Sequence, residues 1–409
     1  MSRINDLIKE LCPAGVEYKN IKDICIENFW VMPSTPKYQV DGVPYITSKN
    51  IRNGKVMFDD IKYITEDDYK IISSNRPIKE NDFLISMIGT IGEVGIVKNT
   101  DLPFYGQNMY LLRLDTKVMN IRFFYHYFSS GKVRNKLLGE KNNGNQGYLK
   151  TKNIEMLNIP IPPLEVQEEI VRILDKFGEL EAELEAELEA RQNQYEFWRG
   201  NIFELENKNY ESYELQEIFD MKNGYTPSTS NNDFWNNGTI PWFRMEDIRL
   251  NGGVLNDAIQ HITPMALKKS GPFKANSIIC ATSATIGVHA LIQCDFLSNQ
   301  RFTCLTLKDE YIKLIDMKYI YYYCFILDEY CKNNLNQGNF SSVDMNAFKR
   351  FEFKIPSLEI QKKIVNVLEH FDKLVNDISE GLPAEIEARR KQYEYYRNKL
   401  LSFEEVSCE

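Results

Sequence analysis

The chain has 409 residues, of which 43% are hydrophobic and 26% are charged, proportions that exclude global disorder and suit two or three folded domains. No stretch of roughly 18 apolar residues occurs, and the first residues lack the apolar segment of a secretion signal, so we expect no membrane association. The eight cysteines form no C-x-x-C pair and only four histidines are present, so we expect reduced thiols, no metal, no cofactor and a cytoplasmic protein.

The net charge of −9 disfavours nucleic acid as a partner when it is taken as an average. Residues 165–206 alone carry 13 acidic and 4 basic residues, however, which equals the deficit of the whole chain. Residues 1–158 are net +4 and residues 207–354 are net −1. The acidic character therefore belongs to one segment.

Four segments are predicted in chain order. Residues 1–158 and 207–354 are rich in aromatic and β-branched residues with Gly and Asn between them, which predicts two strand-rich domains of mixed structure. Residues 159–206 and 355–409 carry apolar residues at intervals of three or four, which predicts a long helix in each, the second followed by a short tail. We therefore expect the α+β class.

The two helical segments repeat each other. Residues 161–177 and 355–371 are identical at 9 of 17 positions, and both begin with Ile-Pro-x-Leu-Glu-x-Gln. Ala-Glu-x-Glu-Ala-Arg then recurs at 186–191 and 384–389, with Gln-Tyr-Glu after it in both copies. Helices of roughly 40–45 residues with one apolar face need a partner, so we expect the repeats to pack as a coiled coil. Gly381 and Pro383 should interrupt the second helix.

The two domains also align, though more weakly. Val43–Arg52 aligns with Ile240–Arg249, and Gln107 aligns with Gln300. The chain is therefore a tandem duplication in which the helices are similar and the domains have diverged, which indicates related but non-identical tasks for the two domains.

With these repeats, the opening segment at 7–18 and Tyr-Glu-Tyr-Tyr-Arg at 393–397, the chain resembles the specificity subunit of type I restriction-modification systems. The resemblance covers essentially the whole chain. It implies a pseudo-twofold tandem repeat, in which two target recognition domains are separated by two long helices packed as an antiparallel coiled coil. The family's usual spacer repeat has Thr at several positions where Glu stands in residues 179–190.

The resemblance also implies a function. Each recognition domain would read one half of a split, asymmetric sequence in double-stranded DNA, and the helix pair would fix the gap and hold two methyltransferase subunits. Restriction subunits would join through the assembled complex. The chain itself would be a non-catalytic subunit, and its sequence holds no nucleotide-binding P-loop, no methyltransferase motif and no nuclease cluster.

Polar residues in the predicted loops are candidate DNA contacts, because their donors and acceptors match phosphates or base edges. In the first domain they are Lys49, Asn50, Arg52, Thr90, Gln107, Asn108, Asn145, Gln146 and Lys150. In the second they are Arg244, Arg249, Thr282, Ser283, Thr285, Gln300, Arg301, Asn336 and Gln337. The alternative for each is an ordinary solvated loop, a turn between strands or a side chain that caps backbone groups.

Several aromatic residues are predicted to pack rather than to bind. Tyr45 and Trp242 should lie in the domain cores, and four residues of the helices should pack between elements: Tyr195, Trp198, Tyr393 and Tyr396. Aromatic residues that prove exposed on the helices would be candidates for holding the methyltransferase.

Two other hypotheses stay open at this stage. One is a protein–protein scaffold, in which a coiled coil carries two β-rich interaction domains and binds no DNA. The other is a DNA enzyme with an unrecognised site. Salt-sensitive DNA affinity separates the first from a recognition subunit, and methyl-donor turnover by the chain alone tests the second.

Overall fold

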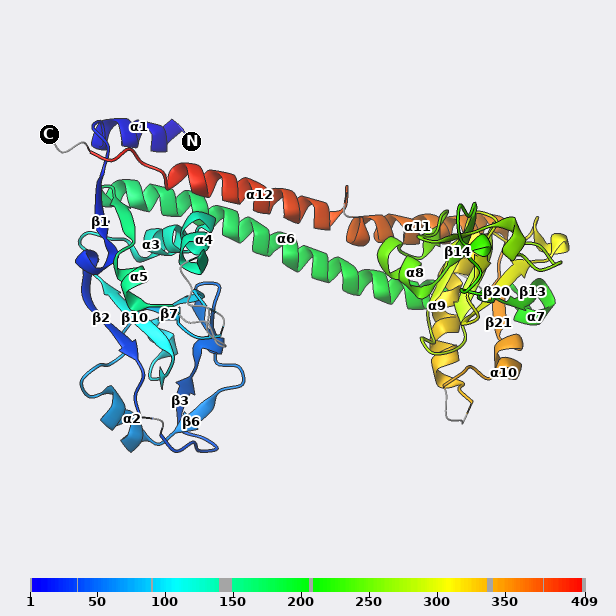
Figure 1. Ribbon diagram of the computed structural model, residues 1–409, viewed down its shortest axis with the longest axis horizontal. Coiled ribbons are helices and arrows are strands. Elements are labelled where there is room, and N and C mark those ends of the chain that lie inside the picture. Colours follow the sequence, from blue (N-terminus) through cyan, green and yellow to red (C-terminus); the bar gives the residue numbers. More distant parts are fainter. Residues whose placement is uncertain are drawn as a thin grey trace. The chain divides into compact units, whose positions relative to one another are not determined.

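Figure 1 shows the protein as a computed structural model, which describes residues 2–34, 36–89, 91–139, 149–205, 209–336, 341–377 and 379–406. The chain divides into two compact units, residues 1–185 with 385–409 and residues 186–384. Each unit joins one strand-rich domain to parts of both helical repeats. No helix within the described ranges is both long and apolar enough to cross a membrane.

The first unit is built on a four-stranded antiparallel sheet in the order β2-β10-β7-β8. A three-stranded sheet, β6-β3-β9, shares a core with it, and β1 pairs with β11. The strands are β1 Glu17–Asn20, β2 Cys25–Val31, β3 Val43–Ile46, β4 Ile51–Arg52, β5 Lys55–Val56, β6 Lys62–Ile64, β7 Phe83–Ser86, β8 Val94–Ile96, β9 Tyr105–Gly106, β10 Met109–Leu114 and β11 Asn158–Ile161. The helices of the domain are α1 Ser2–Leu11, α2 Glu66–Ser73, α3 Ile121–Phe128, α4 Gly131–Gly139 and α5 Thr151–Glu155.

The second unit has the same plan. Its five-stranded sheet runs β13-β20-β17-β18-β15, its three-stranded sheet runs β16-β14-β19, and β12 pairs with β21. The strands are β12 Glu211–Glu214, β13 Phe219–Asn223, β14 Ile240–Phe243, β15 Val254–Leu255, β16 His261–Ile262, β17 Ser277–Ala281, β18 His289–Ile292, β19 Leu297–Ser298, β20 Phe302–Leu307 and β21 Glu352–Ile355. The helices of the domain are α7 Leu215–Ile218, α8 Met245–Asn251, α9 Met317–Asn333 and α10 Met345–Lys349.

The two divergent domains share a buried strand at the centre of the larger sheet. In both, the sheet centre is a run buried on both faces, as in β7 and β17, where every residue is buried. Strands covered on both faces read as continuous apolar runs rather than as alternating ones. Each unit also has one parallel pair of strands at the equivalent place, β3 with β9 in the first unit and β14 with β19 in the second.

The first helical repeat is a single helix, α6 (Leu164–Leu205) of 42 residues. The second is divided into α11 (Leu358–Asn376) and α12 (Leu382–Leu400), which confirms the interruption expected at Gly381. A Cβ atom on Gly381 would lie 2.6 Å from the carbonyl oxygen of Lys373, so the chain can pass this close only with glycine.

Within each unit the two repeats pack on each other. In the first unit, Phe177 of α6 stacks on Tyr396 of α12, and Arg390 of α12 binds Glu181 and Glu185 one turn apart on α6. Residues later in α12 thus contact residues earlier in α6, so this pair is antiparallel. In the second unit, Tyr195 of α6 stacks on Phe371 of α11.

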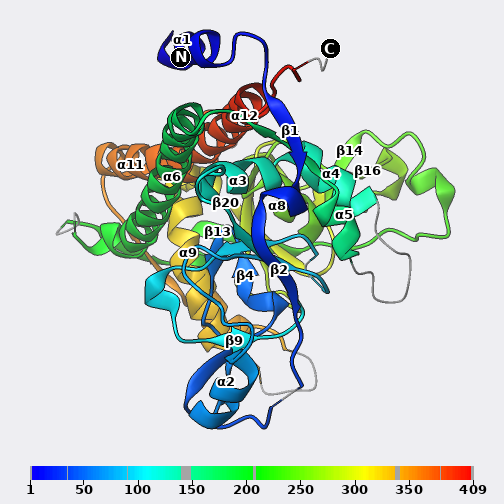
Figure 2. The same cartoon turned by 90° about the vertical axis from the view of Figure 1, so that its left-hand side faces the viewer.

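The helices also close the domain cores. In the first unit, the N-terminal part of α6 contributes Val166, Ile170 and Leu174 to the core that contains α3 and the sheet. The corresponding core of the second unit includes Ile202 and Phe203 of α6 and Ile364 of α11. The segment that leads into β1 contacts the segment that follows α12, where the Val16 N–H donates to the Glu404 carbonyl at 2.8 Å (Figures 1 and 2).

Candidate nucleic-acid interface

Loops of the first domain that are far apart in sequence meet at one edge of its sheets. The Gln107 N–H donates to the Ile46 carbonyl at 3.1 Å, which joins the loop after β9 to the loop after β3. The Met87 N–H donates to the Asn108 carbonyl at 3.2 Å, and the Leu149 N–H donates to the Met87 carbonyl at 3.3 Å. These bonds add the loop after β7 and the segment before α5 to one cluster of four loops, which we call the loop edge.

The second domain has the same loop edge. The Asn299 N–H donates to the Phe243 carbonyl at 3.1 Å, and the Thr282 N–H donates to the Arg301 carbonyl at 3.1 Å. The Val343 N–H then donates to the Thr282 carbonyl at 3.0 Å. Three backbone hydrogen bonds thus link the equivalent loops in both units, although the side chains there differ.

These bonds correct one part of the sequence alignment. Gln107 and Asn299 hold equivalent positions, and so do Asn108 and Arg301, because each pair makes the same backbone bonds. Gln300 is an additional residue in the second domain and is not the counterpart of Gln107. The sequences alone align Gln107 with Gln300 because both loops contain one glutamine, and this identity hides the one-residue insertion.

The exposed cations of the first loop edge are Lys49, Arg52 and Lys150. Asn50 differs from them, since it is only 7% exposed. Its Oδ1 accepts from the Thr47 N–H at 3.1 Å, and its Nδ2 donates to the Asp59 carbonyl at 2.9 Å. The Asn50 amide therefore holds its own loop and is directed away from a ligand.

Gln107 and Asn108 are half-buried. The Tyr45 hydroxyl donates to Oε1 of Gln107 at 3.4 Å, and burial raises the pKa of Tyr45, so this donor stays protonated. Asn108 has φ of +64°, a left-handed conformation that Asn tolerates better than most residues. Tyr45 itself is buried, as expected.

In the second domain, Arg244 and Arg249 lie at the two ends of α8. Arg249 is exposed, whereas the Arg244 guanidinium binds Glu246 at 3.0 Å and lies over the ring of Trp242. Trp242 is buried, as expected. Arg249 is therefore the more accessible of the two cations.

The loop after β17 presents hydroxyl groups. The Thr282 hydroxyl is bonded to that of Thr303 at 2.9 Å, and the backbone of Ser283 bridges to Ser342. Thr285 follows Ala284, which has φ of +65°. This loop is a tight turn between two strands, as is the Gly-rich loop after β7, where Gly89 and Gly92 have φ of +81° and +80°.

The remaining candidates fall into three groups. Gln300 and Arg301 are exposed at the loop after β19. The Asn336 amide donates to the Val343 carbonyl at 3.1 Å, so part of its hydrogen-bonding capacity is used within the domain. Thr90, Asn145, Gln146 and Gln337 lie outside the described residues.

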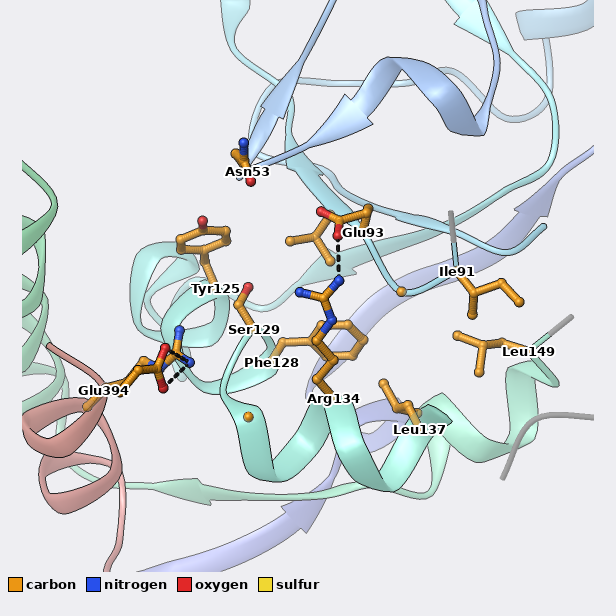
Figure 3. Close-up of a pocket in the computed structure, with 14 residues that line it drawn as sticks. Asn53, Ile91, Glu93, Tyr125, Phe128, Ser129, Arg134, Leu137, Leu149 and Glu394 are labelled. Atoms are coloured by element: carbon orange, nitrogen blue, oxygen red, sulfur yellow. Dashed lines mark hydrogen bonds and ion pairs between the residues drawn. The ribbon is translucent and has the colours of Figure 1, made fainter. Parts of the chain in front are cut away.

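A pocket adjoins the first loop edge (Figure 3). Gly92 and Leu149 line it from the loops, and Glu394 and Arg397 line it from α12. Arg134 of α4 binds Glu93 at 2.8 Å in the same pocket. The wall includes Tyr125, whose ring would lie 2.8 Å from a Cβ atom added to Gly54.

The second unit has a pocket at the equivalent place. Glu196 and Arg199 of α6 line it, and they correspond to Glu394 and Arg397 in the repeat. Tyr321 lies against Gly253 there, as Tyr125 lies against Gly54 in the first unit. The Glu-x-x-Arg turn is part of the sequence repeat, but that the turn lines a pocket in each unit is visible only in the folded chain.

The same turn exposes one aromatic residue in each repeat. Phe197 is 57% exposed and Tyr395 is 61% exposed, and they occupy the same position between Glu and Arg. The aromatic residues expected to pack do so: Tyr195, Trp198, Tyr393 and Tyr396 all belong to the domain cores or their margins. Phe197 and Tyr395 do not fit the spacing of three or four residues that the buried apolar side chains of the helices follow. This departure in the sequence indicates that the two rings are exposed.

The site holds no catalytic constellation that we can recognise among the described residues. No group of His, Cys, Asp and Glu side chains in the described ranges is arranged to hold a metal ion. The buried His289 contacts Asp328 at 2.6 Å, but it packs against Phe325 in the interior of the second domain. The polar side chains of the loop edges offer hydrogen-bond donors and acceptors.

The fold is a tandem duplication of one strand-rich domain, and each copy carries a loop edge with exposed polar side chains. A family model for the type I restriction modification DNA specificity domain matches residues 13–190 and 207–388. The chain therefore belongs to the family of type I restriction modification DNA specificity domains.

Two relatives from Escherichia coli support this assignment. The chain is 46% identical over 202 residues to the type I restriction enzyme EcoprrI specificity subunit, in a match that covers 48% of this chain and 50% of the relative. It is 35% identical over 270 residues to the EcoR124I/EcoR124II specificity subunit, covering 61% and 64%. The chain thus spans between half and two thirds of the length of these relatives.

The fold is shared with a solved structure that concerns the structural basis of complex assembly and conformational transition in the type I R-M system. The TM-score is 0.66 at 15% identity, and the match covers 95% of this chain and 98% of the other. This likeness confirms the α+β fold with two strand-rich domains and long helices.

Proposed function

We propose that this chain is the sequence-specific DNA-binding subunit of a type I restriction-modification complex. Residues 1–158 and 207–354 would each read one half of a split, asymmetric site in double-stranded DNA. Residues 159–206 and 355–409 would fix the gap between the halves and hold two methyltransferase subunits, and restriction subunits would join the assembled complex in the cytoplasm. The chain would supply recognition and no catalysis.

The observation that carries this proposal is the pair of loop edges. Both are joined by the same three backbone hydrogen bonds, while their exposed side chains differ, with Lys49 and Arg52 in one and Arg249 and Gln300 in the other. One backbone geometry with two sets of side chains is what two unlike half-sites require, because base edges are told apart by their donors and acceptors. From the candidates, we retain these exposed residues with Lys150, Arg301, Thr282 and Ser283, and we assign Asn50 to its loop.

The repeated Glu-aromatic-aromatic-Arg turn supports docking of two copies of one partner. Phe197 and Tyr395 present an exposed aromatic ring at the same position of each repeat, and aromatic residues are enriched at protein interfaces. Two equivalent contacts on one chain suit two identical subunits.

Charge indicates how the DNA would be held. The first domain is net +4 and the second net −1, which is little for a protein that must neutralise phosphates. The methyltransferase subunits would therefore complete a positive channel, and the Glu-rich segment of α6 would face solvent or protein.

The test compares DNA binding by the chain alone and with its methyltransferase partner, over a range of salt concentrations. We expect weak binding alone and tight, salt-sensitive binding by the complex. A scaffold that binds no DNA would show no salt-sensitive affinity in either state. Methyl-donor turnover by the purified chain alone would show that it is an enzyme and would overturn the non-catalytic assignment.

A further inference from the structure

The loop after β19 is fixed by hydrogen bonds on both sides of one exposed residue, Gln300. The Phe302 N–H donates to the Asn299 carbonyl at 3.2 Å, and the Arg301 N–H donates to Oδ1 of Asn299 at 3.0 Å. The loop is also fixed from outside, because Asn299 bonds to Phe243 and Arg301 bonds to Thr282. Gln300 is the exposed residue at its tip, and it is the residue that the first domain lacks.

A second segment supports this tip. The Gly224 N–H donates to the Phe302 carbonyl at 3.0 Å, and the Tyr225 N–H donates to the Ser298 carbonyl at 2.8 Å. A Cβ atom on Gly224 would lie 2.3 Å from the carbonyl oxygens of Ser298 and Asn299, so only glycine allows this approach. The two segments are therefore held side by side.

This contact brings Thr226 to Gln300. The Thr226 hydroxyl donates to Oε1 of Gln300 at 2.5 Å. The bond uses one lone pair of Oε1, so the second lone pair and the whole NH2 group of the amide stay available for a ligand. A free glutamine side chain is flexible, whereas this one is restrained at its far end.

Adenine is the base that matches such an amide. In the major groove it offers an N6 amino donor beside the N7 acceptor, and Gln pairs with both through its oxygen and its NH2 group. The Thr226 hydroxyl restrains the far end of the Gln300 side chain, so the amide is held at the loop tip before DNA arrives.

We propose that Gln300 reads an adenine in the half-site of the second domain, and that Thr226 is the residue that positions it. The inference rests on the proposed function, since it requires that this loop edge faces DNA. The first domain has no counterpart of Gln300, and its own glutamine in that loop, Gln107, is half-buried and accepts a hydrogen bond from the Tyr45 hydroxyl.

The experiment selects preferred sequences from randomised DNA with the assembled methyltransferase complex and counts the bases at every position. We expect a split motif with adenine in the second domain's half. Gln300→Ala should reduce the preference for adenine at that one position by about 5- to 150-fold and leave the other positions unchanged. Thr226→Val, which keeps the shape and removes the hydroxyl, should reduce the same preference.

Controls separate reading from folding. Thr226→Ser keeps the hydroxyl and should keep the preference, and Gln107→Ala should leave the second half-site as it is. Uniform loss of affinity on all sequences in Gln300→Ala, or an unchanged preference, would overturn the inference alone, provided that the unaltered complex selects a split motif. An unaltered complex that selects no sequence would overturn the proposed function together with it.

Discussion

Gln167 and Gln361 make the same three hydrogen bonds in the two units, and both side chains are fully buried. Oε1 of Gln167 accepts from the Asn120 N–H at 2.7 Å, and its Nε2 donates to the carbonyls of Val118 and Pro162 at 2.9 and 2.8 Å. The repeated glutamine therefore ties the start of α6 to the chain that leads into α3.

In the second unit, Oε1 of Gln361 accepts from the Asp316 N–H, and its Nε2 donates to the carbonyls of Leu314 and Pro356, all at 2.8 Å. These bonds tie α11 to the chain before α9. The glutamine of Ile-Pro-x-Leu-Glu-x-Gln is thus repeated because it performs the same structural task twice, with no part in recognition.

Replacing Gln167 by Leu should lower the free energy of unfolding of the first unit. The change leaves one backbone N–H and two carbonyls without partners in a buried place, at a cost of about 1–3 kcal/mol for each. We expect a loss of at least about 2 kcal/mol, measured by urea denaturation of the full chain. Gln192→Leu, at an exposed position of the same helix, is the control, and equal midpoints for the two variants would contradict the assignment.

Acid should destabilise the first unit through His126. This residue is buried between Tyr393 of α12, at 3.0 Å from Nδ1, and Asp175 of α6, at 2.7 Å from Nε2. Burial lowers the pKa of His126 below 6.5, although Asp175 opposes the shift. Burial alone would raise the pKa of Asp175, but hydrogen bonds from His126 and Arg122 outweigh it and lower that pKa to about 2.

The sign follows from proton binding. Between pH 6.5 and the lower pKa of the folded state, the unfolded chain binds a proton at this histidine that the folded chain does not, so stability falls as the pH drops through that range. We expect the urea midpoint of the unaltered chain to fall between pH 7.5 and pH 5.5 by more than that of His126→Asn. The difference between the two proteins isolates His126 from all other titrating groups, and parallel pH profiles would refute its role.

The length of α6 should set the gap in the recognised sequence. The Leu-Glu-Ala-Glu repeat lies within one unbroken helix, so removal of Glu183–Ala186 shortens it by about 6 Å. That is nearly two base-pair steps of about 3.4 Å. We expect a shorter gap between unchanged half-sites when the methylated motif is mapped in cells carrying the variant and its partner. An unchanged gap would mean that another element sets the spacing.

Removing the exposed aromatic rings should weaken the binding of methyltransferase subunits to the chain without unfolding it. Phe197→Ala and Tyr395→Ala remove side chains that are 57% and 61% exposed, so stability should change by less than about 0.5 kcal/mol. Each single variant should bind one methyltransferase copy less tightly, and the double variant should lose both, as measured by the mass of the complex. Full occupancy in the double variant would place the docking contact elsewhere.

Much of the fold was predictable because its signals are local. Apolar residues at helical spacing predicted α6, and Gly381 predicted the break between α11 and α12, since both depend on neighbours within a few residues. Burial of Tyr45 and Trp242 followed from their strand-like surroundings. Which loops would meet was beyond that reach, because residues such as Met87 and Leu149 are joined only in the folded chain.

The sequence by itself determined the duplication, the order of domains and helices, and the resemblance to a family, since repeats and periodicity are written in neighbouring residues. Only the tertiary structure decided that Asn50 faces inward, that Gln300 is an added residue with Thr226 behind it, and that Phe197 and Tyr395 face solvent. The physical reason is that the direction of a side chain depends on which distant backbone groups claim its hydrogen bonds and on how each helix is rotated against its partner.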